Sequence, residues 1–210
     1  MIKIIKTRTS LLVAAIFLSV TVVNNCSAQD WNVRLLNSIN PTHPDSKYWI
    51  NTSRSAFYLP GALSFGGLIY GLSANDEAAR RNSYELFLSI GVNALITEGL
   101  KISVNEERPA DKYPKEIFTN SVSHGHSFPS GHTALAFTTA TTVALEYHKW
   151  YITVPAYLWA GSVGYSRMYL GKHYPTDVFA GAVTGIGTGY LSHWLSKQIF
   201  KPYVQKKTYE

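Results

Sequence analysis

Three short strings in this 210-residue chain contain residue types that could together act on a phosphate group. They are Lys101 with Arg108-Pro109, then Pro129-Ser130-Gly131-His132, then Ser166-Arg167 with His173 and Asp177. They supply three cations, two imidazoles, a turn at a helix start and one carboxylate. Such a set could bind an oxyanion, attack phosphorus and protonate a leaving group without a metal. Each string alone is unspecific, so the hypothesis depends on all three occurring in this order.

The candidate phosphate ligands with a positive charge are Lys101, Arg108 and Arg167. Taken singly, a lysine at the end of an apolar stretch commonly extends to the membrane interface, and arginine before proline is common in loops. Three cations on one face nevertheless need an anionic partner. Acidic residues of the same loop are one candidate, and a phosphate is the other, because guanidinium groups can donate two parallel hydrogen bonds to it. The acidic candidates are Glu106, Glu107 and Asp111.

The second string opens an apolar stretch and predicts the start of a helix. Ser130 is a candidate N-cap, and Gly131 lets the backbone approach a ligand closely. The first amides of a helix have no internal partner, so they can bind an anion. A plain helix cap would explain Ser130 and Gly131 equally well. It would not explain His132, whose imidazole could donate a proton to a departing alkoxide.

The third string places His173 four residues before Asp177, with Pro175 between them. Proline is typical of the first turn of a helix, which predicts that a helix begins here and contains Asp177 in its first turn. The carboxylate could then accept from one ring nitrogen of His173 and leave the other free to attack. A His–Asp pair that only stabilises a loop is the alternative.

His124 and His126 could bind a metal with His132 as a third ligand. The surrounding stretch has no cysteine or paired carboxylate to complete a site of the usual type. We therefore interpret the loop as solvated and predict no metal and no cofactor.

Residues 1–28 have the pattern of a secretory signal, with basic residues first, an apolar middle and the small residues Cys26-Ser27-Ala28 at the end. An uncleaved membrane anchor is the alternative. Cys26 is the only cysteine, so cleavage near Ala28 would leave no thiol. Cleavage would also leave 16 basic against 13 acidic residues, and a net charge of +3 is too small to argue for a nucleic-acid partner.

Five apolar stretches follow the leader, at 55–75, 86–104, 133–145, 150–166 and 178–196. A membrane-spanning helix needs about 20 apolar residues, so several of them are marginal. Frequent small residues permit the close helix approach that is typical in lipid. We predict an all-α helical bundle with five transmembrane helices after signal removal, or six if the leader is uncleaved. A soluble all-helical bundle would bury similar faces and is the alternative.

Charge placement predicts the orientation. With five spans, Arg80-Arg81, Lys149 and the lysine-rich tail fall on the cytoplasmic side, as the positive-inside rule requires. The loops 105–131 and 167–177 then share the outer face, where the three strings would meet. The predicted organisation is a signal peptide at 1–28, a polar periplasmic arm at 29–54, a helical domain at 55–200 and a tail at 201–210.

Together the strings resemble the signature of the type 2 phosphatidic acid phosphatase (PAP2) superfamily, which also includes bacterial acid phosphatases and vanadium-dependent haloperoxidases. That resemblance implies an all-helical, metal-independent enzyme. It implies that His173 is the nucleophile and forms a phosphohistidine, that Asp177 orients it and that His132 protonates the leaving group. The implied phosphate ligands are Lys101, Arg108, Arg167, Ser130 and the Gly131 amide. The string from Gly171 to Gly181 is more similar to the membrane-embedded branch.

The expected function is hydrolysis of a lipid phosphate monoester or diphosphate at the periplasmic face of a bacterial inner membrane. Candidate substrates are phosphatidylglycerol phosphate, phosphatidic acid, polyprenyl diphosphate and lipid A phosphates. A soluble periplasmic acid phosphatase of broad specificity is the main alternative. A haloperoxidase and a non-catalytic binder of phosphate or lipid are the others. The sequence makes no prediction about the oligomeric state.

Overall fold

The computed structural model describes residues 26–122 and 124–199. Within these residues every regular element is a helix, and none is a strand. The helices are α2 (Cys26–Ile39), α3 (Lys47–Ser73), α4 (Glu77–Val104), α5 (Pro109–Lys112), α6 (Gly131–Tyr147), α7 (Trp150–Tyr169) and α8 (Pro175–Ile199). The predicted all-α helical bundle is confirmed. Most of the predicted signal segment and the tail at 201–210 lie outside the described residues.

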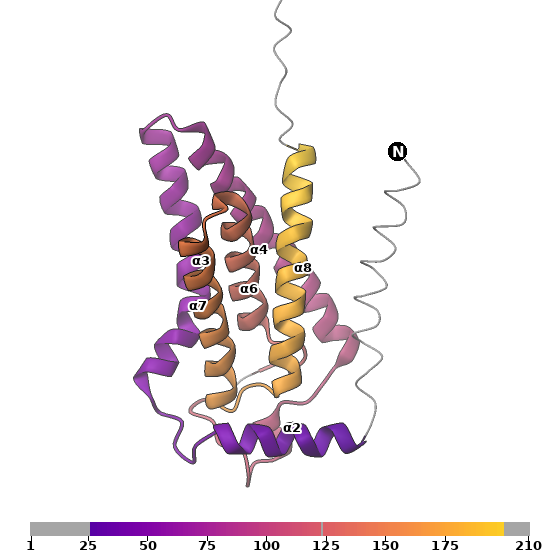
Figure 1. Ribbon diagram of the computed structural model, residues 1–210. Helices are drawn as coiled ribbons and strands as arrows, with labels where there is room; N and C mark the ends of the chain where they lie inside the picture. Colours follow the sequence, from indigo (N-terminus) through magenta and orange to yellow (C-terminus); the bar gives the residue numbers. More distant parts are fainter. Residues whose placement is uncertain (1–25, 123, 200–210) are drawn as a thin grey trace, which may run out of the picture.

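The five long helices lie side by side, and α2 crosses one end of them (Figure 1). The central helix is α6, because it packs against α3, α4, α7 and α8. Successive long helices run in opposite directions, so α4 and α7 end where α6 and α8 begin. All four of these helix ends lie at the end of the bundle that α2 crosses, and they carry the three strings.

Helix α2 is fastened to this end by two asparagines. The side chain of Asn32 donates to Thr176 Oγ1 at 2.7 Å, and that of Asn40 donates to the carbonyl of Tyr169 at 2.8 Å. Asn40 also accepts from the Phe118 amide at 2.7 Å. These bonds connect α2 to the loop before α6 and to the turn between α7 and α8, so α2 holds the two loops in place.

The predicted boundary of the polar arm at residue 54 falls inside α3, which begins at Lys47. The residues Asn51-Thr52-Ser53-Arg54 are polar, but nothing in them stops a helix. Ser53 is buried because it faces Arg167 of α7 and accepts a hydrogen bond from its Nη1 at 2.7 Å. Ser53 therefore belongs to the polar interior of the bundle, whereas Asn51 and Arg54 of the same turn are exposed.

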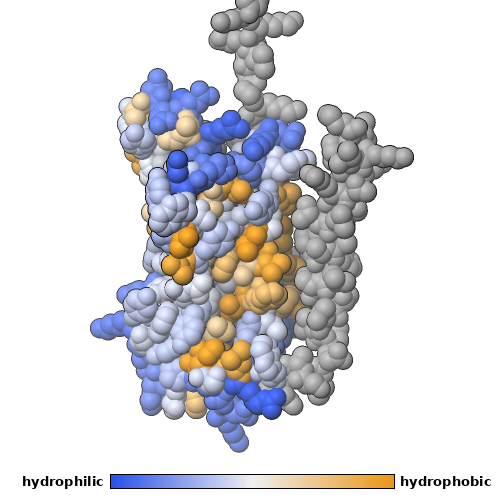
Figure 2. Space-filling view, viewed as in Figure 1, coloured by the Kyte–Doolittle hydropathy of each residue, from blue (hydrophilic) through white to orange (hydrophobic). Residues whose placement is uncertain are grey.

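The bundle buries small and polar side chains and exposes large apolar ones. In α8 the buried residues are Asp177, Gly181, Gly185, Thr188, Gly189, Ser192 and Ser196. The same helix exposes Phe179, Tyr190 and Trp194, with Phe179 at 72%. Figure 2 shows hydrophobic side chains across the middle of one face and hydrophilic ones at both ends. Small residues at helix contacts and an apolar exterior are typical of helices that pack in lipid.

Length and hydropathy alone identify one helical stretch among the described residues, Glu77–Lys112, as able to cross a membrane. The other long helices contain many glycine, serine, threonine and tyrosine residues, which lower their mean hydropathy. The five predicted stretches all form helices, while the number of transmembrane helices stays a prediction.

Two glycines of α8 test whether close helix contact stabilises this bundle. A Cβ added at Gly185 would collide with the Ala134 carbonyl and lie 2.8 Å from Phe137 Cβ, whereas one added at Gly187 would meet nothing within 4 Å. We expect Gly185→Ala to destabilise the protein by about 1–3 kcal/mol. Gly187→Ala should be neutral or slightly stabilising, because alanine favours helix. Thermal unfolding in detergent measures both, and equal melting temperatures would contradict the packing argument.

Candidate active site

The three strings meet at the end of the bundle that α2 crosses. Lys101 lies in the last turn of α4, Arg108 directly precedes α5, and Ser130 directly precedes α6. Arg167 lies in the last turn of α7, and Asp177 in the first turn of α8. The backbone joins two strings directly, because the Ser130 amide donates to the Asp177 carbonyl at 3.0 Å. The structure thus brings the predicted site residues together, while their chemical roles stay predictions.

His173 lies in the turn between α7 and α8 with 2% of its surface exposed. Its Nδ1 is 3.4 Å from Asp177 Oδ2, and its Nε2 is 3.4 Å from Arg108 Nη1. Nδ1 forms no hydrogen bond of normal geometry, so the carboxylate stands beside the ring without a tight bond to it. Nε2 is the nitrogen that faces a cation and is therefore the candidate attacking atom.

Burial lowers the pKa of His173 well below its ordinary value, and the positive charges of Arg167 and Arg108 lower it further. His132 and Lys101 act in the same direction. At neutral pH the imidazole is therefore uncharged and keeps a lone pair available for attack. The same interactions show that groups from all three strings lie close enough to act on one ring.

The two arginines are buried and are held by neutral oxygens. Arg108 donates from Nη1 to the Lys172 carbonyl at 2.9 Å and from Nε to the Gly125 carbonyl at 3.1 Å. Arg167 donates from Nη1 to Ser53 Oγ, while its buried Nε has no partner. Among the described residues neither arginine forms an ion pair with a carboxylate. Asp177 and Asp111 attract Arg108 electrostatically, but neither forms a direct ion pair with it, and two buried cations without an ion pair are suited to a bound anion.

The start of α6 lies beside Lys101 and adds hydrogen-bond donors to the site. Ser130 occupies the N-cap position, but its hydroxyl lies 2.8 Å from Thr133 Oγ1 and does not cap the helix backbone. Ser130 is thus the N-cap residue as predicted, while its hydroxyl takes the buried Thr133 hydroxyl as its partner. The ammonium of Lys101 lies 3.7 Å from the position that a Cβ on Gly131 would take. Free helix amides and a lysine thus share one place, which suits an anion.

His132 and the loop histidines have separate surroundings. The ring of His132 packs edge-on against Phe57 with 4.6 Å between centroids. His124 is exposed, and its carbonyl accepts from Arg108 Nη2 at 3.4 Å. In the described part of the chain no group of three His, Cys, Asp or Glu side chains could hold a metal ion.

Sequence reasoning missed two residues of the site and gave a third a different partner. Ser53 binds Arg167, as described above. The hydroxyl of Ser127 donates to Asp177 Oδ2 at 2.6 Å, and the same oxygen accepts from the Tyr174 amide at 2.9 Å. Ser127 lies two residues before the second string, and this proximity is the sequence signal that could have identified it. Nothing in the sequence marks Ser53, which lies more than 100 positions from its partner.

The third residue is Glu106, which the sequence offered as a partner for the cations and whose carboxyl group contacts that of Asp177. The Ser127 amide donates to the Glu106 carbonyl at 2.7 Å and so fixes the loop beside Asp177. Glu106 Oε2 and Asp177 Oδ1 are both buried without a donor. Burial raises the pKa of Glu106, although its bond with Asp177 and the charge of Lys112 oppose this. Two carboxyl groups in contact do not both ionise easily, so we expect one proton to be shared between them.

A family model described as the PAP2 superfamily matches residues 83–201. This is more than half of the chain, and the chain belongs to that superfamily. The resemblance that the three strings predicted is confirmed.

Curated relatives match part of the chain. The chain is 44% identical over 79 residues to the lipid A 1-phosphatase of Porphyromonas gingivalis, covering 36% of this chain and 18% of that protein. It is 36% identical over 75 residues to the lipid A 4'-phosphatase of Bacteroides thetaiotaomicron, covering 36% of this chain and 33% of that protein. The chain therefore spans one third or less of the length of these two relatives.

Two solved structures share the fold. The transmembrane PAP2-type phosphatidylglycerolphosphate phosphatase of Bacillus subtilis superposes with a TM-score of 0.72 at 19% identity, covering 91% of this chain and 97% of that one. Aquifex aeolicus LpxE superposes with a TM-score of 0.62 at 32% identity, covering 78% of this chain and 95% of that one. Both comparisons cover nearly the whole length of the solved chain.

The contact between Glu106 and Asp177 predicts how stability depends on pH. An acid with a raised pKa binds its proton more tightly in the folded state, so stability falls as pH rises from its ordinary value towards the raised one. Glu106→Gln keeps a polar partner for Asp177 but cannot ionise. We expect wild type to lose more thermal stability than Glu106→Gln between pH 5 and pH 8, measured in detergent. Parallel curves would contradict a shared proton.

Proposed function

We propose that the protein is a metal-independent phosphatase that hydrolyses lipid phosphate monoesters or diphosphates through a phosphohistidine at His173. The observation that carries this proposal is the position of His173, buried between Asp177 and Arg108 with 3.4 Å to each. A neutral imidazole beside uncompensated cations is suited to attack an anionic phosphate ester. Membership of the PAP2 superfamily and the names of the phosphatase relatives support the same reaction.

In the first step the phosphate binds among Arg108, Arg167 and Lys101, with the Ser130 hydroxyl and the Gly131 amide as further donors. Nε2 of His173 forms a bond to phosphorus while the bond to the leaving oxygen breaks, and His132 gives that oxygen its proton. Asp177 stabilises the positive charge that the His173 ring acquires. The preformed cations and amides stabilise the charge on the transferred group.

In the second step His132 accepts a proton from water, and the water oxygen attacks phosphorus. The bond between phosphorus and His173 breaks, and inorganic phosphate leaves with both residues restored to their starting state. No step requires a metal, because cations and amide groups neutralise the phosphoryl oxygens.

The substrate is proposed to be a lipid because the site lies at one end of a bundle that exposes large apolar side chains along its middle. The relatives named as lipid A phosphatases and the solved phosphatidylglycerolphosphate phosphatase suggest the range of headgroups. Arg80, Arg81 and Lys149 lie at the opposite end of the bundle, at the starts of α4 and α7. Under the positive-inside rule that end is cytoplasmic, and the active site faces the periplasm of the bacterial inner membrane.

Replacing the nucleophile tests the reaction. We expect His173→Ala to reduce phosphate release from phosphatidylglycerol phosphate, lipid A and undecaprenyl diphosphate on the order of 10³-fold or more. His43→Ala is the matched control, because His43 is exposed and forms only a backbone hydrogen bond. Purified protein in detergent is assayed with and without chelator. Full activity of His173→Ala, or loss of activity with chelator, would refute the mechanism.

Membrane extraction tests the location. We expect the protein to remain in the membrane pellet after washing with alkaline carbonate, because large apolar side chains cover the middle of the bundle. A periplasmic protein of known solubility in the same cells serves as the control. Release of the full-length protein into the supernatant would favour the soluble acid phosphatase.

A further inference from the structure

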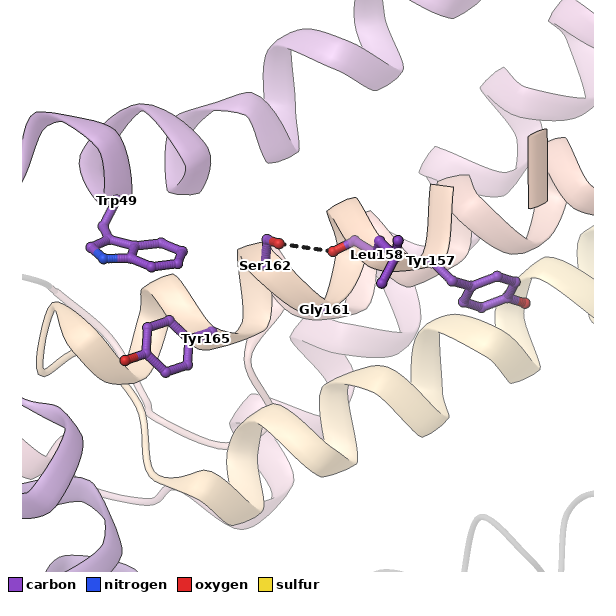
Figure 3. Close-up of a pocket in the computed structure, with 6 residues that line it drawn as sticks. All are labelled: Trp49, Tyr157, Leu158, Gly161, Ser162 and Tyr165. Carbon is purple, nitrogen blue, oxygen red and sulfur yellow. Dashed lines mark hydrogen bonds between the residues drawn. The ribbon is translucent and has the colours of Figure 1, made fainter. Parts of the chain in front are cut away.

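A groove runs along the outer face of α7, outside the cluster of catalytic residues. Six residues line it: Trp49, Tyr157, Leu158, Gly161, Ser162 and Tyr165. Figure 3 shows that five of them come from α7 and that Trp49 of α3 stands at the same end as Tyr165. The groove has a volume of about 400 Å³. Between Tyr157 and Tyr165 it follows about 12 Å of helix.

The aromatic end of this groove adjoins the phosphate site. Trp49 and Tyr165 pack together with 4.7 Å between ring centroids. Trp49 lies one helical turn before Ser53, and Tyr165 lies two residues before Arg167. Ser53 and Arg167 are hydrogen-bonded at 2.7 Å. The two helices that close the groove at this end therefore also hold a buried cation of the phosphate site.

The lining is suited to hydrocarbon. Leu158 is 67% exposed, and Gly161 provides an open floor because a Cβ there would meet nothing within 4 Å. Two of its polar groups are bonded within the protein: the Ser162 hydroxyl donates to the Leu158 carbonyl at 2.9 Å, and the Tyr157 hydroxyl lies 2.9 Å from Thr141 Oγ1. A ligand in this groove would therefore contact apolar surface and aromatic faces.

We propose that the groove binds one hydrocarbon chain of the lipid phosphate while its phosphate occupies the site beside Arg167. This inference depends on the proposed function and adds the subsite for the apolar part of the substrate. The groove begins beside the phosphate site and continues along α7 towards the middle of the bundle, where the exterior is apolar. A chain that leaves the phosphate at Trp49 and Tyr165 thus stays in apolar surroundings along its length.

Gly161→Leu tests the groove, because leucine fills the floor where the structure has free space. The matched control is Gly91→Leu in α4, which is equally exposed and equally free of neighbours within 4 Å. Dioleoyl phosphatidic acid and p-nitrophenyl phosphate, which has no hydrocarbon chain, are assayed in the same detergent. We expect the ratio of kcat/KM for the lipid to kcat/KM for the chain-free ester to fall about ten-fold in Gly161→Leu. Gly91→Leu should keep the wild-type ratio.

An unchanged ratio in Gly161→Leu would overturn the inference, and so would an equal fall in both variants. If Gly161→Leu changes the oligomeric mass but not the ratio, the groove is a contact between copies of the chain. That result would also overturn the inference. If Gly161→Leu does not accumulate, Leu158→Ala removes an exposed wall of the groove and should lower the same ratio. Failure of the proposed function is distinguishable, because wild type would then release phosphate from neither substrate.

Discussion

The constraint on which this site depends is the burial of Arg108 and Arg167 without ionic partners. Their donors are directed to carbonyl and hydroxyl oxygens, which fix the guanidinium planes but form no ion pair with either charge. Removing a charge from water without a counterion costs free energy that the rest of the fold must offset. A phosphate ester supplies the missing negative charge. Because the cations are already in place, little reorganisation is needed when charge develops on the transferred group.

Bringing the strings together at one site also requires α6 and α8 to approach closely. Asp177 has to reach the loop that carries Ser127 while the main chain of α8 accepts from the start of α6 at Ser130. A Cβ on Gly181 would lie 2.7 Å from the Ser130 carbonyl, so only glycine leaves room for this contact. The small residues that lower the hydropathy of α8 are therefore the residues that let two strings meet. In α8 the same small residues therefore account for both the low mean hydropathy and the close contact at the site.

The sequence predicted the helical class, and its three strings, unspecific one by one but informative together, contain the residues that the fold brings to one end of the bundle. It could not predict the supporting contacts. Ser53 belongs to a segment that the sequence predicted to be a polar arm. The reason for a serine at this position is its hydrogen bond with Arg167 on another helix. Glu106 looked like a partner for the cations but lies against Asp177. Such pairings depend on how the helices cross, and one sequence contains no information about that.

A lipid phosphate has a charged part and an apolar part, and the C-terminal end and the middle of α7 offer each part different surroundings. Arg167 at its C-terminal end is buried among polar groups, whereas Leu158 and Gly161 lie on an open apolar face. The transition occurs within about two helical turns, at Tyr165 and Trp49, whose rings have apolar faces and a polar edge. An enzyme that leaves the chain in apolar surroundings while it binds the phosphate avoids the cost of moving hydrocarbon into water. Binding free energy from the phosphate is then available for the reaction itself.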